Sequence, residues 1–246
     1  MRSTPTLAAL CAIAVLGLTA CGGEDKGDGA DKAGAKASAK GTALTELTGP
    51  QIANKALKAT KGVSALTFTL DGTEDGAPVK YRVSSDSSGD CVADLGIDGG
   101  TVKLIKKGDT AYMKYDAAFW KAQGKDGEDA AKVIGDRWTK TKASGSDAKA
   151  LTEACDSDQL LAEAATGPNA ARKGRTTTVD GRPAIILTEQ DGDATYTMYV
   201  ATEGKPYFLK VEQKGGKDPG TITFSDFDKP VGAVAPKGDV VDLDQP

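Results

Sequence analysis

Few residue types in this sequence could carry catalytic chemistry, because its 246 residues include no histidine. Ser-His-Asp and Cys-His nucleophiles and His-ligated metal sites are thereby excluded. Paired carboxylates can hydrolyse glycosides, and the sequence clusters acids at Glu189, Asp191, Asp193, Asp226 and Asp228. These five fall in expected turns or at a strand end, where turn geometry and solubility explain them. We therefore expect no enzymatic activity.

Motifs and net charge exclude further classes of protein. The patterns GxxxxGK[ST] and GxSxG are absent, and no GxGxxG follows an expected strand. Asp191-Gly192-Asp193 resembles the start of a calcium loop, but the remaining ligands are missing. The net charge of −4, with 35 acidic against 31 basic residues, disfavours nucleic acid as a partner. No metal, cofactor or nucleic acid is expected.

Two small basic clusters are the other charged features. They are Arg172, Lys173 and Arg175, and Lys106 with Lys107. Either cluster could contact anionic lipid headgroups, although solvated strand ends are the simpler interpretation.

The first 20 residues are predicted to be an export signal. Arg2 supplies a positive charge, and Leu7–Leu18 is a run of small and aliphatic residues. As a helix this run would span roughly 18 Å, well short of the ~30 Å hydrocarbon core of a bilayer. A cleaved signal is therefore favoured over a lasting transmembrane anchor.

Leu18-Thr19-Ala20-Cys21 resembles the lipobox of bacterial lipoproteins. The resemblance implies that the Cys21 thiol receives a diacylglyceryl group and that the signal is cleaved before it. Two or three acyl chains then give stable membrane attachment. An ordinary signal with an unrelated cysteine is the alternative. The rest of residues 21–42 is mostly Gly, Ala, Lys and acids, which predicts a disordered spacer.

The cysteines beyond the signal and the anchor are Cys91 and Cys155. An even pair in an exported chain is predicted to form a disulfide. Closing a loop of about 65 residues would stabilise the fold by roughly 4 kcal/mol. The alternative, a reactive thiol, lacks a neighbouring base or a CxxC partner.

Helix signals occur before and between the predicted strands. Thr48-Gly-Pro-Gln51 is a capping box that predicts a helix through Lys61, with Ile52, Ala56, Ala59 and Val63 on its apolar face. The centre of the chain is predicted to hold a short helical or irregular piece at Asp116–Gln123, a weak helix at Glu128–Ile134, a loop at Ser144–Asp147, and a helix at Leu160–Thr166 capped from Asp156.

Alternation of apolar and polar residues predicts strands with one face in a core. Gly-containing dipeptides between them predict turns. The strands centre on Leu66–Leu70, Val79–Val83, Ala93–Ile97, Val102–Leu104, Ala111–Tyr115, Arg175–Val179, Ala184–Thr188, Tyr196–Val200, Tyr207–Val211 and Ile222–Phe224. The turns are Asp71-Gly72, Asp75-Gly76, Asp98-Gly99, Gly108-Asp109, Asp180-Gly181, Asp191-Gly192, Glu203-Gly204 and Gly215-Gly216.

These elements predict an α+β fold. About nine strands without βαβ alternation favour one curved antiparallel sheet, with helices covering its inner face. The 13 aromatics all lie from Phe68 to Phe227, which favours one domain. We expect a signal peptide at 1–20, a lipidated cysteine and spacer at 21–42, and a single domain at 43–246. The inner face either is filled by the helices or encloses an acyl-chain cavity.

Several segments together resemble the actinobacterial LppX/LprG-type lipoproteins, which are related to LolA-like carriers. They are Gly62–Leu70, Trp138, Gly181–Leu187, Tyr196–Val200, Pro206–Lys210 and Ile222–Pro230. The resemblance covers about residues 48–244. It implies a half-barrel of about 9–11 antiparallel strands whose concave side, lidded by helices, holds lipid or lipid-linked glycan. The family shares no catalytic residues.

The resemblance and the lipobox together predict a monomeric lipoprotein anchored to the outer face of the cell membrane. It is expected to bind or carry a lipid, a glycolipid or another amphipathic ligand. The alternative is a surface or regulatory lipoprotein that binds a protein partner without transport. The residues expected to line the ligand site by apolar contact are Leu66, Phe68, Leu70, Tyr196, Met198 and Val200.

Overall fold

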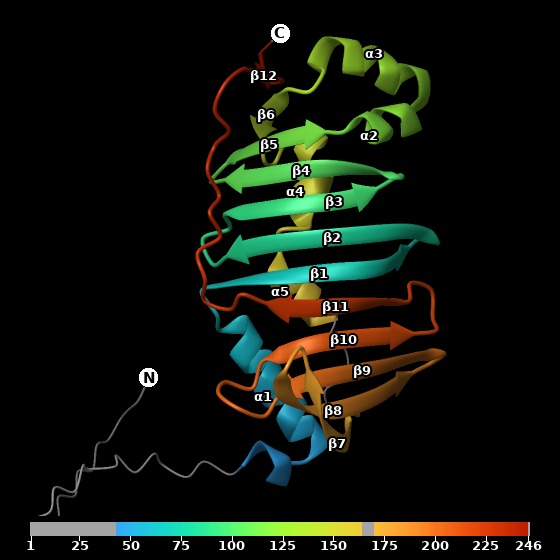
Figure 1. Ribbon diagram of the computed structural model, residues 1–246, viewed down its shortest axis with the longest axis vertical. Coiled ribbons are helices and arrows are strands. Elements are labelled where there is room, and N and C mark those ends of the chain that lie inside the picture. Colours follow the sequence, from blue (N-terminus) through green and yellow to red (C-terminus); the bar gives the residue numbers. More distant parts are fainter. Residues whose placement is uncertain (1–42, 164–169, 246) are drawn as a thin grey trace, which may run out of the picture. The chain divides into compact units, whose positions relative to one another are not determined.

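The computed structural model describes residues 43–163 and 170–245 (Figure 1). The chain divides into two compact units, and the second, Gly41–Pro246, contains all the described elements. The predicted signal peptide, Cys21 and spacer lie outside the described residues, as does the predicted helix end at residues 164–166.

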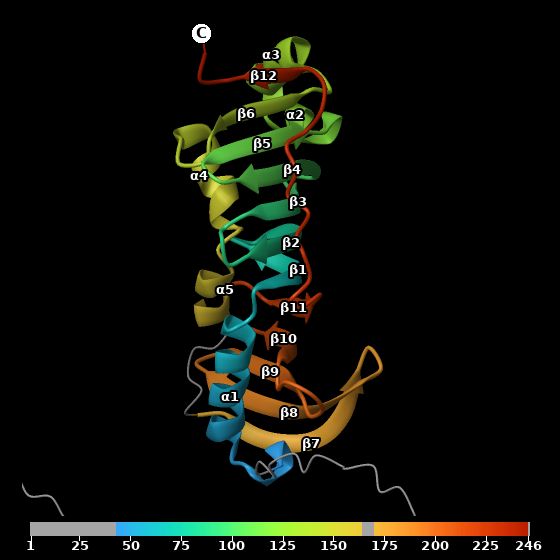
Figure 2. The same cartoon turned by 90° about the vertical axis from the view of Figure 1, so that its left-hand side faces the viewer.

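One sheet of twelve strands runs through the described residues, in the order β12-β6-β5-β4-β3-β2-β1-β11-β10-β9-β8-β7. Neighbours are antiparallel, except that β12 pairs with β6 in parallel. The sheet is curved and unclosed, so the predicted α+β half-barrel is confirmed (Figure 2). The strands are β1 Ala65–Glu74, β2 Ala77–Asp86, β3 Cys91–Ile97, β4 Gly100–Lys107, β5 Thr110–Tyr115, β6 Trp138–Lys142, β7 Arg172–Val179, β8 Arg182–Asp191, β9 Ala194–Ala201, β10 Phe208–Lys214, β11 Gly220–Ser225 and β12 Val240–Asp242.

Strands β6 and β12 were not predicted, and they bring the total above the expected number. The inward positions of β6 are Thr139 and Thr141, so the strand lacks an apolar alternation. Their hydroxyls are satisfied instead, because Thr139 Oγ1 donates to the Met113 carbonyl at 3.1 Å and Thr141 Oγ1 donates to Asp244 Oδ1 at 2.7 Å. Buried threonines thus replace the apolar pattern from which strands are usually predicted.

The pairing of β1 with β11 joins two antiparallel meanders, β1–β6 and β7–β11. Phe68 lies opposite Phe224, and Gly72 lies opposite Gly220. Beyond the paired residues of β1 and β11, the Asp228 N–H donates to the Ala65 carbonyl at 2.8 Å, and the Thr73 N–H donates to the Pro219 carbonyl at 3.1 Å. The seam between the meanders is therefore hydrogen-bonded past both of its ends.

The turn predicted at Asp71-Gly72 was wrong, since both residues lie inside β1 and the chain reverses at Asp75-Gly76. A Cβ on Gly72 would lie 2.7 Å from Gly220 Cα and 2.7 Å from the Pro219 carbonyl oxygen. Gly72 therefore permits close approach of β1 to β11, a recognised use of glycine within strands.

Five α-helices and a 3₁₀ turn accompany the sheet in the described residues. In Figure 2, α4, α5 and α1 follow one another along one face of the sheet. The capping box of α1 is present, with the Thr48 N–H donating to Gln51 Oε1 at 3.0 Å. The loop predicted at Ser144–Asp147 ends early, because α4 begins at Ser146. The helices are η1 Leu44–Glu46, α1 Gly49–Lys61, α2 Ala117–Ala122, α3 Gly124–Ile134, α4 Ser146–Glu153 and α5 Ser157–Glu163.

Helix α1 contacts β10 through Thr60, a fully buried residue whose role was not predicted from the sequence. The register of β10 shifts between Phe208 and Lys210. Thr60 Oγ1 accepts a hydrogen bond from the Phe208 N–H at 3.0 Å and donates to the Ala56 carbonyl at 2.8 Å. The hydroxyl thus provides an acceptor for the buried Phe208 N–H. A buried N–H group without an acceptor would lower the free energy of unfolding.

We expect Thr60→Val to lower the free energy of unfolding by about 1–3 kcal/mol, because it leaves the Phe208 N–H buried without an acceptor. Thr60→Ser retains the hydroxyl and should lose less. Urea unfolding of both variants measures the difference. Equal losses in the two variants would show that the hydrogen bond is unimportant.

Gly72→Ala should lower the free energy of unfolding by about 1–3 kcal/mol, because the new methyl group overlaps the backbone of the neighbouring strand. Gly220→Ala is the matched control, because a Cβ at this position would lie 3.1 Å from its nearest neighbour, Gly72 Cα. The free energy of unfolding should therefore fall by less than in Gly72→Ala. Thermal unfolding tests this order, and the reverse order would contradict the close-approach explanation.

Candidate functional site

A groove of about 640 Å³ lies between the concave face of the sheet and helices α4 and α5. Its apolar side chains come from six strands on one side and from the two helices on the other. The strand residues are Phe68, Leu70, Val79, Tyr81, Leu95, Ile97, Tyr196, Val211 and Ile222. The helix side contributes Ala150, Leu151, Ala154 and Leu160.

Three of the six residues predicted to line a ligand site, Phe68, Leu70 and Tyr196, do line this groove. Met198 and Val200 lie further along β9, where the sheet packs against α1, and both are buried in the core. Leu66 is also buried and borders a separate cavity of about 60 Å³ near the end of α1. The inner face of the sheet is thus filled by α1 at one end and left open beneath α4 and α5.

Sequence reasoning missed much of the lining, although part of the signal was present. Tyr81 and Ile222 belong to alternating runs from which their strands were correctly predicted. Their place at the groove follows from β1 lying between β2 and β11, which the alternation does not encode. Leu151 and Leu160 lie on short helices, one of which begins inside the predicted loop.

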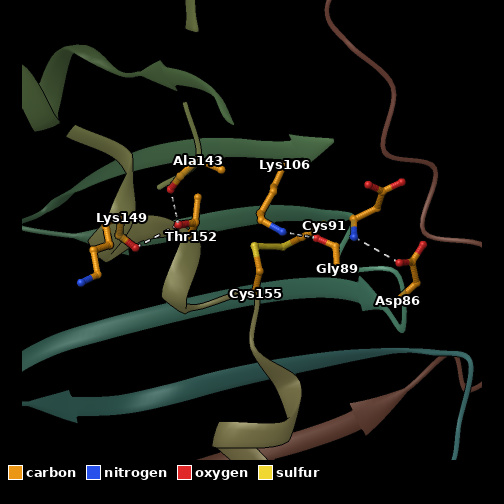
Figure 3. Close-up of a disulfide and its surroundings, with 9 residues drawn as sticks. Asp86, Gly89, Cys91, Lys106, Ala143, Lys149, Thr152 and Cys155 are labelled. Carbon is orange, nitrogen blue, oxygen red and sulfur yellow. Dashed lines mark hydrogen bonds between the residues drawn. A yellow bond between two sulfur atoms is a disulfide. The ribbon is translucent and has the colours of Figure 1, made fainter. Parts of the chain in front are cut away.

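A disulfide between Cys91 and Cys155 places the two helices over the sheet (Figure 3). Cys91 begins β3, and Cys155 lies between α4 and α5. The predicted disulfide is therefore confirmed. A hydrogen bond also connects α4 to the residue that follows β6, because the Thr152 hydroxyl donates to the Ala143 carbonyl at 3.0 Å (Figure 3). The groove roof is thus held to the sheet by the disulfide, by this hydrogen bond and by the buried side chains of Ala148 and Leu161.

The first turn of α5 is capped by Asp156, as predicted. Asp156 Oδ1 accepts hydrogen bonds from the Asp158 N–H at 3.1 Å and from the Gln159 N–H at 3.0 Å. This capping starts the helix immediately after the disulfide and brings Leu160 over the groove.

Tyr81 combines an apolar ring in the groove with a hydroxyl at its margin. The hydroxyl donates to Glu74 Oε2 at 2.7 Å. Burial raises the pKa of the Tyr81 phenol, and the hydrogen bond to Glu74 and the charges of Glu74 and Asp98 raise it further. Tyr81 therefore remains a neutral donor at physiological pH.

The carboxylates that could have suggested catalysis lie outside the groove lining. Glu189 is buried, and this burial, aided by the charge of Asp191, raises the pKa of the Glu189 carboxyl. The pKa of Asp228 is lowered to about 2 by the Ser64 N–H, with help from Lys205 and Tyr207. Asp228 thereby ties the chain after β11 to the start of β1.

The three lysines of the predicted basic clusters have partners within the protein. Lys106 Nζ donates to the Gly89 carbonyl at 2.6 Å, and Lys107 forms an ion pair with Asp90. Lys173 Nζ donates to the Thr45 carbonyl at 3.0 Å. Across the described residues there is no group of His, Cys, Asp and Glu arranged to hold a metal, and no helix there is long and apolar enough to cross a membrane.

No protein-family model and no curated protein sequence matches this chain. Among solved structures, it is similar to the lipoprotein LppX of Mycobacterium tuberculosis, with a TM-score of 0.50 and 15% identity over 75% of this chain and 97% of that chain. LprF of Mycobacterium bovis matches at 0.49 and 13% identity, over 77% and 97% of the two chains. A LolA superfamily protein of Nitrosomonas europaea matches at 0.26 and 10% identity, over 75% and 94%.

The likeness to LppX establishes the fold of this chain. It is a half-barrel of the kind seen in LppX, and the resemblance predicted from the sequence is confirmed at the level of the fold.

Replacing both cysteines, as Cys91→Ala with Cys155→Ala, should lower the free energy of unfolding by about 4 kcal/mol, since it releases a long closed loop. Urea unfolding with and without dithiothreitol measures this loss. The reductant should destabilise the natural protein to a similar extent and leave the double variant unchanged. If the natural protein kept the same free energy of unfolding once its disulfide had been fully reduced, the prediction would be contradicted.

Proposed function

We propose that this protein binds or carries a lipid or another amphipathic molecule in the groove beneath α4 and α5. The observation that carries the proposal is the open volume of about 640 Å³ lined by apolar side chains. Sites for small molecules typically have about 300–1,000 Å³ and mostly apolar walls with a few polar groups. The groove has both properties.

Apolar contact would supply the binding energy. Leu70, Tyr81, Ile222 and Leu151 line the groove and remain partly exposed, so a bound chain would remove further apolar surface from water. Each methylene group that becomes buried contributes about 0.8 kcal/mol. An acyl chain fits this kind of surface better than a compact polar solute does.

We propose further that the protein is a monomeric lipoprotein anchored through Cys21 to the outer face of the cell membrane. The Leu18–Cys21 segment supports lipidation. The disulfide supports an oxidising, extracytoplasmic location, because disulfides are rare in reducing compartments. LppX, whose fold this chain shares, is itself a lipoprotein. The spacer up to residue 42 would then connect the anchor to the domain.

The test is to purify protein carrying Cys21→Ser, extract it with organic solvent and identify bound lipid by mass spectrometry. Ala154→Trp places a large ring in the groove and should reduce the bound lipid about tenfold, as expected when the volume available to the ligand is lost. Val133→Trp is the matched control, because Val133 is 69% exposed on α3, outside the groove, and it should retain the lipid.

Repeated preparations without any bound lipid would contradict the proposal. The alternative function, a partner-binding lipoprotein without transport, would then be favoured if crosslinking also recovered a specific protein partner.

A further inference from the structure

The charged residues that line the groove are all acidic. Glu74 stands at the end of β1, Glu153 ends α4, Asp156 precedes α5, and Asp218 lies before β11. No Lys or Arg lines the groove among the described residues. Glu74, Glu153 and Asp156 are exposed, whereas the strand side chains behind them are apolar and either buried or partly buried. The charges therefore border an apolar interior from three separate parts of the fold.

None of these four carboxylates forms an ion pair within the described part of the chain. Two nearby acids are paired with lysines: Asp71 with Lys80, on the opposite face of β1 and β2, and Asp75 with Lys217. The charge of Asp218 contributes to raising the pKa of Lys217, but the Lys217 ammonium group is hydrogen-bonded to Asp75. Within the described residues, the groove thus keeps four carboxylates with which no lysine or arginine forms an ion pair.

Neutral groups donate hydrogen bonds to three of the four carboxylates. Tyr81 Oη donates to Glu74, and the Asp75 N–H donates to Asp218 Oδ1 at 2.9 Å. Backbone N–H groups of α5 donate to Asp156. Hydrogen bonds of this kind stabilise a carboxylate without removing its net charge. A ligand in the groove therefore meets fixed negative charge beside apolar walls.

We propose that this groove selects amphiphiles whose polar group carries no negative charge, with cationic groups bound most tightly, uncharged groups next and anionic groups least. This inference rests on the proposed function. The apolar walls hold the hydrocarbon chain and contribute equally to all three kinds of ligand. The four carboxylates discriminate between polar groups by charge, because a cleft lined by charge of one sign concentrates ions of the opposite sign.

The experiment compares three probes with a twelve-carbon chain at neutral pH: dodecyltrimethylammonium, monododecanoylglycerol and dodecanoate. Each is titrated below its critical micelle concentration against the protein carrying Cys21→Ser, with displacement of Nile red as the readout. At low salt we expect the cationic probe to bind at least about tenfold more tightly than the anionic probe. Added salt should narrow the difference, since it screens exposed charges.

The decisive variant combines Glu74→Gln, Glu153→Gln, Asp156→Asn and Asp218→Asn. The amides can still accept the hydrogen bonds described above, and Asn caps helices as well as Asp does. The matched control carries Asp126→Asn, Glu128→Gln, Asp193→Asn and Glu203→Gln, which removes the same net charge at exposed positions outside the groove. The first variant should bind the three probes within about twofold of one another, and the control should keep the original order.

The outcomes separate this inference from the proposed function. If all three probes bind the natural protein equally, or the anionic probe binds most tightly, the charge selection is overturned while the groove remains a site for amphiphiles. If the control variant loses the order of probe affinities as fully as the groove variant does, the net charge of the protein and not the groove determines that order. The inference is then again overturned. If no probe and no Nile red binds, both the inference and the proposed function fail.

Discussion

The pairing of β1 with β11 is the interaction on which the rest of the structure depends. It brings together segments such as Ser64 and Asp228, which are 164 residues apart in the chain, and it turns two meanders into one sheet. Without it, each meander would expose an additional unpaired edge. The groove floor includes residues from both sides of this seam, such as Tyr81 and Ile222. The candidate site therefore exists only once the seam has formed.

The second constraint is how the inner face of the sheet is covered. Helix α1 has a full buried face and the Thr60 contact with β10, so it packs closely against its end of the sheet. Helices α4 and α5 are short, and the disulfide at Cys155 holds them near β3. They cover the middle of the sheet without filling it. The helices thus fill one part of the inner face and leave a groove over another.

Local patterns predicted many of the elements, because their causes lie within a few residues. The capping box at Thr48 and the alternation of Leu66, Phe68 and Leu70 are confirmed in α1 and β1. Prediction failed where a residue's role depends on a distant neighbour. Gly72 was taken for a turn residue because its close contact with Gly220 cannot be seen locally. β6 was missed because its buried positions hold hydroxyls.

The amino-acid sequence by itself determined which side chains share a face, where most turns fall, and that two cysteines were available to pair, since these follow from backbone periodicity and residue chemistry. Only the tertiary structure decided which part of that face stays open. Met198 and Leu70 have the same apolar character, yet Met198 is buried in the core near α1, whereas Leu70 lines the groove and remains partly exposed. The reason is physical: burial depends on which helix the folded chain places above a strand. The same placement brings Glu74, Asp156 and Asp218 together, although they lie far apart in the sequence.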